Sequence, residues 1–233
     1  ISRVLSIAMV GAGADDVLLH TPRGYDCPDT AIACATEREM LERFVSRVRE
    51  IDPDVITGWN VVDFDLAFLL RRAEQEGVTM RIGRGREPLL LRESRGVRGG
   101  REPSLPGRLV IDGMRALRGA FVRLEDWSLD GAAHELLGRG KLITGSNRGE
   151  EIIQAFENDR AHLVDYNRLD AQLVLDILDE VNVIPLSVER SQLTGMPPDR
   201  VDASVASFDF LYLAALAKRG IAGPTIREVP GLE

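Results

Sequence analysis

A carboxylate on the apolar face of a helix is the residue of this sequence whose position most needs a chemical explanation. Asp170 lies in a helical stretch at residues 160–181, and Tyr166 comes one turn before it, so their side chains lie one above the other. The apolar stripe around them consists of Leu163, Leu173, Val174, Ile177 and Val181. An ionised aspartate that faces a core costs on the order of several kcal/mol unless its charge is compensated. Asp170 therefore needs an arginine, a hydrogen-bond network or a metal ion, and a structural aspartate satisfied by its neighbours is the alternative.

Two further carboxylates stand where a strand gives way to a helix. Asp63 and Asp65 follow the apolar run at residues 55–57 and a break at Gly58, and a helix begins near Phe64. A strand that leads into a helix in this way presents polar groups at the edge of an α/β sheet. The alternative is purely local, because carboxylates in the first turn of a helix stabilise it by about 0.3–1 kcal/mol each.

The elements that must position these residues are strands that alternate with helices, followed by helices alone. We predict a β-hairpin at residues 3–10 and 16–20, and a helix at 37–51 that starts at a capping box of Thr36 and Glu39. The strand 107–112 is followed by helices at 128–137, 149–158, 160–181, 184–194 and 202–219. This order predicts an α/β domain with a helical extension.

Two other polar features have more than one interpretation. Asp112 ends the apolar strand 107–112, where it could be a ligand, although capping of the following helix is the expected role. From residue 81 to residue 101 seven arginines are interleaved with glycines. This segment is either a solvated loop or a surface that follows phosphates, with Arg84 and Arg86 as its contacts.

The composition is that of an ordinary globular protein. Of the 233 residues 44% are hydrophobic and 28% are charged. No apolar run reaches membrane-spanning length, and the signal-peptide pattern is missing. A net charge of -8 does not suggest a general nucleic-acid binder, although acidic metal sites and local basic patches can coexist. Cys27 and Cys34 fit no zinc pattern and suggest a reducing compartment.

Two motifs of the sequence, taken together, resemble those of a nuclease family. Residues 59–73, WNVVDFDLAFLLRRA, resemble the second exonuclease motif of the family B DNA polymerases. Residues 166–170, YNRLD, resemble the third motif of the tyrosine-bearing branch of the DEDD-type 3′→5′ exonucleases. The order of the motifs, about 100 residues apart, also suits these polymerases, and the similarity extends over nearly the whole chain. Leu169 departs from the pattern, since these polymerases often carry Lys there, but the metal ligand itself is intact.

The resemblance implies a fold, a reaction and a set of site residues. The implied fold is a ribonuclease H-like α/β exonuclease domain at residues 1–182, followed by a helical segment at 183–233 that leads towards the polymerase palm. The implied reaction is proofreading hydrolysis at a DNA 3′ end with two Mg²⁺ or Mn²⁺ ions. By the same resemblance Asp170 holds the metal that carries the attacking water, Tyr166 orients that water, and Asp65 serves the second metal, partly through water.

The resemblance also implies contacts with DNA. Asn60 and Phe64 would contact the frayed 3′ end, Phe64 by stacking, which is worth roughly 1–3 kcal/mol per base. The implied partners are a single-stranded 3′ end, a primer–template and the remaining polymerase domains, with no membrane. The expected location is the bacterial cytosol, in association with the nucleoid.

The first motif of the family, an Asp-x-Glu on the first strand, has no match in this sequence. Either LSIAMVGAG is the second strand and the motif lies upstream of residue 1, or it is a first strand that has lost its acids. We favour the upstream position, and we expect the 233-residue chain by itself to have little or no nuclease activity. The competing hypothesis is a non-catalytic nucleic-acid-binding domain of the same fold, in which the motif residues persist without function.

Overall fold

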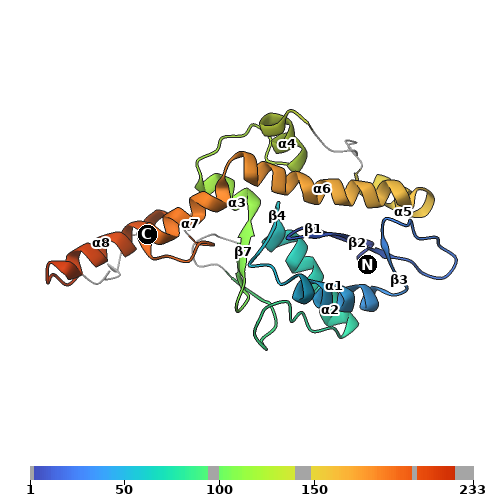
Figure 1. The fold of residues 1–233 in the computed structure, drawn as a ribbon, viewed down its shortest axis with the longest axis horizontal. Coiled ribbons are helices and arrows are strands. Elements are labelled where there is room, and N and C mark those ends of the chain that lie inside the picture. The colour runs from blue at the N-terminus through green and yellow to red at the C-terminus, as the bar shows by residue number, and fades with distance from the viewer. Residues whose placement is uncertain (1–2, 94–99, 140–147, 201–203, 224–233) are drawn as a thin grey trace, which may run out of the picture.

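The computed structural model describes residues 3–93, 100–139, 148–200 and 204–223, which form a mixed α/β structure (Figure 1). The strands are β1 (Ser6–Gly11), β2 (Ala14–His20), β3 (Ile32–Cys34), β4 (Val55–Gly58), β5 (Leu90–Glu93), β6 (Arg101–Ser104) and β7 (Leu109–Asp112). The helices are α1 (Glu37–Ile51), α2 (Ala67–Glu76), α3 (Gly113–Gly119), α4 (Leu129–Leu137), α5 (Arg148–Asn158), α6 (Arg160–Glu180), α7 (Val183–Thr194) and α8 (Ser204–Lys218). A π-helix, η1 (Val61–Leu66), lies between β4 and α2.

The described strands form three small sheets. In the first, β1 pairs antiparallel with β2 through a two-residue turn, and β3 adds to β2 in parallel. Both turn residues, Ala12 and Gly13, have positive φ, the conformation that suits the twist of a tight hairpin. The second sheet pairs β4 with β7 in parallel, and the third pairs β5 with β6. Among the described residues, β1 pairs only with β2, and β4 pairs only with β7.

Helix α6 connects the first two sheets from one side. It contacts β1, β2 and β4, and it runs across the molecule above them in Figure 1. On the opposite side α1 contacts β2 and β3, and α2 packs against α1. The buried side chains of α1 and α2 share one apolar core with strand residues such as Ile7 and Leu18. The first sheet therefore lies between α6 and the α1–α2 pair, with its apolar side chains covered on both faces.

Most of the predicted elements are confirmed, and their ends agree with local signals. Thr36 Oγ1 accepts the N–H of Glu39 at 3.1 Å, as the predicted capping box requires, and Glu39 Oε2 accepts the N–H of Ala35, one residue before the cap, at 2.8 Å. Helix α4 begins at the cap of Ser128 and ends at Gly138, which has a φ of 68°. The hairpin and the helices predicted from residue 128 onwards are also found where they were expected.

The structure differs from the prediction in two places. It contains one strand that was not predicted, the three-residue β3, whereas the helix expected after Asp112 is found as the seven-residue α3. The arginine-rich segment had a solvated loop as one of its two interpretations, and residues 81–89 do lie outside any helix or strand. Residues 90–93, however, form β5, which pairs with β6 so that Leu90 lies opposite Ser104 and Glu93 opposite Arg101. This hairpin is set by backbone pairing between residues 8 to 14 positions apart, and the local composition of arginine and glycine does not reveal it.

A buried ion pair ties the start of the chain to α1 and α2. Glu37 and Arg72 side chains are 6% and 8% exposed, and two bonds of 2.6 and 2.5 Å join them. Glu37 Oε1 also accepts the N–H of Val4 at 3.0 Å. Burial by itself would raise the pKa of the Glu37 carboxyl, but the bonds from Arg72 and Val4 outweigh it, so this pKa is lowered.

The lowered pKa of Glu37 predicts how stability depends on pH. A carboxylate with a lower pKa in the folded state stabilises the protein above its unfolded pKa, and this contribution is lost as the pH falls through the folded value. We expect the free energy of unfolding to decline below about pH 4.3, the ordinary value for glutamate, and to decline less steeply in Glu37→Gln. Urea denaturation of both proteins between pH 7 and pH 3 measures the difference, and parallel profiles would contradict the prediction.

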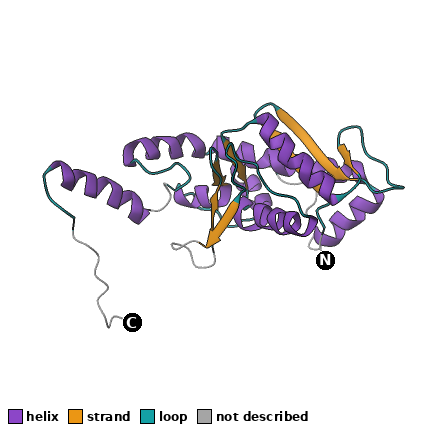
Figure 2. Ribbon diagram, turned by 90° about the horizontal axis from the view of Figure 1, so that it is seen from below, coloured by secondary structure: helices purple, strands orange, loops and turns teal. Residues whose placement is uncertain are grey.

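The C-terminal helices extend away from the sheets. Helix α7 contacts α3 and α6, and α8 contacts α7. Figures 1 and 2 both place α8 at the end of the molecule opposite the β1–β2 hairpin. Within the described part of the chain, no helix is both long enough and apolar enough to cross a membrane.

Candidate active site

The π-helix η1 carries the second motif, and its side chains differ in how far they are exposed to solvent. Val61, Val62 and Leu66 are buried, whereas Phe64 is 68% exposed and Asp65 is exposed beside it. Short π-helical segments are rare and occur frequently at functional sites. The structure thus presents one aromatic ring and one carboxylate, adjacent in sequence, to the solvent at the carboxyl end of β4.

Close backbone packing fixes the point where η1 begins. A Cβ atom on Gly58, the last residue of β4, would lie 2.9 Å from the Cβ of Val61, so glycine is required there. Asn60 precedes η1, and its carbonyl accepts the N–H of Phe64 at 3.0 Å. In the neighbouring strand β7, Asp112 pairs with Gly58, and it caps α3 by accepting the N–H of Arg115 at 3.1 Å. The predicted capping role of Asp112 is therefore confirmed.

Asp63 and Asp65 differ in their surroundings, which the sequence could not predict. The Asp63 carboxylate forms an ion pair with Arg115, and it also accepts the backbone N–H of Arg101 at 3.1 Å. Asp65, two residues later, lies on the exposed side of η1. Of the two carboxylates, Asp63 therefore anchors the segment to its neighbours, while Asp65 faces the solvent.

Helix α6 places Tyr166 and Asp170 between two apolar clusters. Tyr166 is 8% exposed and packs with Val17 and Leu19 of β2. One turn after Asp170, the helix joins a second cluster, formed with α3, α4 and Trp59. Asp170 itself is half-buried. Trp59 lies between β4 and η1 in the sequence, and it packs against this cluster. The turn of α6 that follows Asp170 is therefore close to the start of the segment that carries Asp65.

The donor atoms available here suit a hard cation. Carboxylate oxygens are the ligands that Mg²⁺ and Mn²⁺ prefer, and Asp65 and Asp170 supply them. Within the described residues, no group of three or more His, Cys, Asp or Glu side chains is placed to hold a metal ion. The two aspartates therefore fit a divalent cation in kind, but the described residues do not assemble a closed ligand set.

Arg84 and Arg86, the predicted phosphate contacts, lie in a different region from the Asp65 segment. Arg84 pairs with Asp52 and Asp54, each at 2.8 Å, just before β4 begins. The Asp65 segment follows the opposite end of β4, so the strand separates the two. Arg84 thus has a structural partner set that the sequence did not reveal. Arg86 is exposed, and its contact with DNA stays a prediction.

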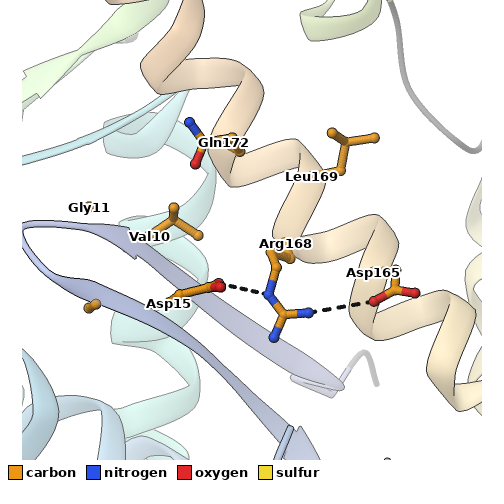
Figure 3. A pocket seen from close by; sticks show the side chains of 8 residues that line it. Val10, Gly11, Asp15, Asp165, Arg168, Leu169 and Gln172 are labelled. Atoms are coloured by element: carbon orange, nitrogen blue, oxygen red, sulfur yellow. Dashed lines mark hydrogen bonds and ion pairs between the residues drawn. The ribbon is translucent and has the colours of Figure 1, made fainter. Parts of the chain in front are cut away.

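An open groove of about 440 Å³ lies between the β1–β2 hairpin and α6 (Figure 3). Arg168 occupies it, with its Nε 2.7 Å from Asp15 and its Nη1 3.5 Å from Asp165. Its Nη2 donates to the carbonyl of Thr30 at 2.7 Å. Two carboxylates thus neutralise this guanidinium, and the groove offers little attraction for a phosphate.

Comparison with known proteins places the chain among polymerases. The family model described as DNA polymerase family B, exonuclease domain, matches residues 15–131. The chain is 39% identical to DNA polymerase II of Escherichia coli (strain K12) over 228 residues, which cover 96% of this chain and 29% of that protein. It is 28% identical to the DNA polymerase delta catalytic subunit of Caenorhabditis elegans, over 71% of this chain and 16% of the relative. It is 31% identical to a DNA polymerase of Thermococcus aggregans, over 79% of this chain and 10% of the relative. The chain spans less than a third of the length of each.

Proposed function

The chain belongs to the exonuclease domain of the family B DNA polymerases, and from this premise we propose that it is the proofreading 3′→5′ exonuclease region of a DNA-directed DNA polymerase. One observation carries the proposal. The exposed pair Phe64–Asp65 follows β4, and the helix that contacts β4 is the one that bears Tyr166 and Asp170. An aromatic ring and a carboxylate that follow β4, together with a second carboxylate on the helix that contacts β4, are suited to hold a nucleotide and to hydrolyse a phosphodiester.

Each residue has a distinct role in this proposal. Phe64 stacks on the terminal base, and Asn60 contacts the same nucleotide. Asp65 and Asp170 are the oxygen ligands for two ions, Mg²⁺ or Mn²⁺, which when bound supply the positive charge needed at a scissile phosphate. Tyr166 lies one turn from Asp170, is largely buried, and orients the attacking water through its hydroxyl.

The free edges of two strands support the ribonuclease H-like fold. In the described residues β1 has no strand partner besides β2, and β4 none besides β7, while α6 contacts both β1 and β4. One additional strand between β1 and β4 would join the two sheets into a single mixed sheet beneath α6. We place the Asp-x-Glu motif of the family on such a strand, which would bring its acids beside Asp65 and Asp170.

The rest of the polymerase is the proposed partner of α8. This helix exposes apolar side chains, each at least 47% exposed: Val205, Phe208, Phe210, Leu211, Tyr212 and Leu213. A patch of this kind marks an interaction surface, and the relatives continue well beyond the length of this chain. We therefore propose an exonuclease domain at residues 1–182 and, at 183–233, a segment whose described helices, α7 and α8, dock on the palm; residues 201–203 and 224–233 lie outside the described residues. The similarity to DNA polymerase II of Escherichia coli supports the bacterial cytosol as its proposed location.

Removing the exposed ring of Phe64 should weaken binding of the DNA end. Stacking of one base on an aromatic side chain is worth roughly 1–3 kcal/mol, so Phe64→Ala in the full-length protein should raise the KM for a single strand about 5- to 160-fold. Phe121→Ala is the matched control, because Phe121 is 79% exposed but lies between α3 and α4. Steady-state degradation of a labelled oligonucleotide measures both, and equal KM values in the two variants would argue against stacking at Phe64.

The proposed function is tested by degradation of a single DNA strand labelled at its 5′ end. We expect the full-length protein with Mg²⁺ to shorten the strand progressively from its 3′ end, and a chelator to stop it. Residues 1–233 alone should leave the strand intact, and extension upstream by about twenty residues should restore degradation. If the full-length protein binds the strand but never shortens it, the domain is a non-catalytic binding module.

A further inference from the structure

We infer that Asp112 is a positioning residue, which joins the first turn of η1 to the first turn of α3 and thereby holds Phe64 and Asp65 in place. The inference rests on the proposed function, because it assigns Asp112 a part in that same site. It goes beyond the capping of α3, for which a single acceptor atom would be enough.

Both oxygen atoms of the Asp112 carboxylate are used, and they serve different elements. Oδ1 accepts the N–H of Arg115 in α3 at 3.1 Å, and Oδ2 accepts the N–H of Val62 in η1 at 3.2 Å. Asp112 is only 5% exposed, so water does not readily replace either bond. Since Val62 precedes Phe64 and Asp65 by two and three residues, its anchoring limits where those side chains can move.

A second connection closes a ring around the same turn. The Arg115 guanidinium forms an ion pair with Asp63, and its Nη1 donates to the carbonyl of Arg101 at 2.8 Å. Arg115 is therefore held by Asp112 through its backbone and by Asp63 through its side chain. Asp112 holds Val62, and Arg115, itself bound to Asp112, holds Asp63. The π-helix is thus fixed at two successive residues, just before the exposed Phe64 and Asp65.

A buried, charged carboxylate such as Asp112 costs free energy, and a helix cap alone does not need a charged group. Burial raises the pKa of this carboxyl, opposed by the two N–H bonds and by the charge of Arg115, while Asp63 raises it further. Keeping the group ionised therefore costs free energy. At α4 the hydroxyl of Ser128 caps the helix by accepting the N–H of Gly131 at 3.0 Å without a charge. The second acceptor oxygen of Asp112, which a serine lacks, explains why an aspartate rather than a serine stands at this position.

Two substitutions in the full-length protein distinguish the bond from Asp112 to η1 from its capping of α3. Asp112→Asn keeps the shape but replaces one acceptor oxygen with a donor, so one of the two N–H groups loses its partner. Asp112→Ser keeps one acceptor that can cap α3, as Ser128 does at α4, and removes the bond to Val62. The matched control is Thr36→Ala, which removes one cap bond of 3.1 Å at α1.

Hydrogen exchange followed by mass spectrometry reads the local effect, and strand degradation reads the functional one. For Asp112→Ser we expect amides at residues 61–66 to exchange at least tenfold faster, those of α3 to exchange as in the wild type, and kcat to fall about 10- to 100-fold, the usual effect of losing a residue that orients a metal ligand. Thr36→Ala should leave η1 exchange and kcat unchanged. Asp112→Asn should speed exchange in η1 or in α3, according to which of the two N–H groups loses its acceptor.

The proposed function and the positioning role of Asp112 are contradicted by different results. If the wild type degrades no DNA, the proposed function is wrong, and the exchange data alone decide whether Asp112 holds η1. If the wild type is active but Asp112→Ser matches Thr36→Ala in both η1 exchange and kcat, Asp112 is only a helix cap and the inference is overturned. If Asp112→Asn does not fold, the serine variant still decides between the two.

Discussion

Replacing Asp170 by asparagine in the full-length protein is expected to slow 3′→5′ degradation of a DNA strand by roughly a thousandfold or more. The substitution keeps the shape of the side chain and removes its negative charge. Metal-ion catalysis contributes several kcal/mol of charge stabilisation in the transition state, and about 1.4 kcal/mol corresponds to a factor of ten in rate. Binding of the single strand should change little, because Phe64 and Asn60 lie on a different element.

Asp179→Asn is the matched control for Asp170→Asn. Asp179 lies on the same helix, loses the same charge, and is exposed rather than half-buried. Its degradation rate should equal that of the wild type. If Asp170→Asn retained more than a tenth of the wild-type rate while Asp179→Asn was unaffected, Asp170 would be a structural aspartate, the alternative that its position on an apolar stripe leaves open.

The largest effect on stability is expected at the Glu37–Arg72 pair. Removing one partner of a buried ion pair leaves an uncompensated charge in the core and typically costs about 3–5 kcal/mol. Arg72→Met should therefore lower the free energy of unfolding of residues 1–233 by an amount in this range, measured by urea denaturation. It also deprives Glu37 of the bonds that keep its pKa low.

Two further variants distinguish a buried charge from a general effect of mutation. Glu42→Gln breaks an exposed pair with Arg38, in which the side chains are 53% and 56% exposed, and should cost no more than about 0.5 kcal/mol. The double variant Glu37→Leu with Arg72→Met removes both charges and should recover a large part of the loss. A loss in Arg72→Met no larger than in Glu42→Gln would show that the pair does not stabilise the core.

The sequence predicted best those elements whose signals are local. The capping box at Thr36 and Glu39, the glycine after α4 and the apolar stripe of α6 involve residues within a few positions of one another, and all three were found. The hairpin β5–β6 was missed because its pairing joins residues up to fourteen positions apart. The strand β3 was missed because its three residues carry too short a pattern to be read.

Within the site, the sequence identified the residues but not the roles of their neighbours. Which of Asp63 and Asp65 faces the solvent depends on the π-helical winding of η1, and an α-helical reading of the same residues does not give it. The bond between Asp112 and Val62 spans 50 residues, and that between Arg84 and Asp52 spans 32. Contacts of this kind follow from the packing of the whole domain, so only the structure reveals them.

The most direct test of the account is to locate bound Mn²⁺ by anomalous X-ray scattering from crystals of the full-length protein with a short single strand. The central claim is that Asp65 and Asp170, about 100 residues apart in sequence, serve one metal-dependent site. It predicts one anomalous peak within about 2.0–2.3 Å of a carboxylate oxygen of Asp170 and a second that Asp65 binds directly or through one water, with the 3′ end of the strand against Phe64. Mn²⁺ bound elsewhere, or a strand that does not approach Phe64, would contradict it.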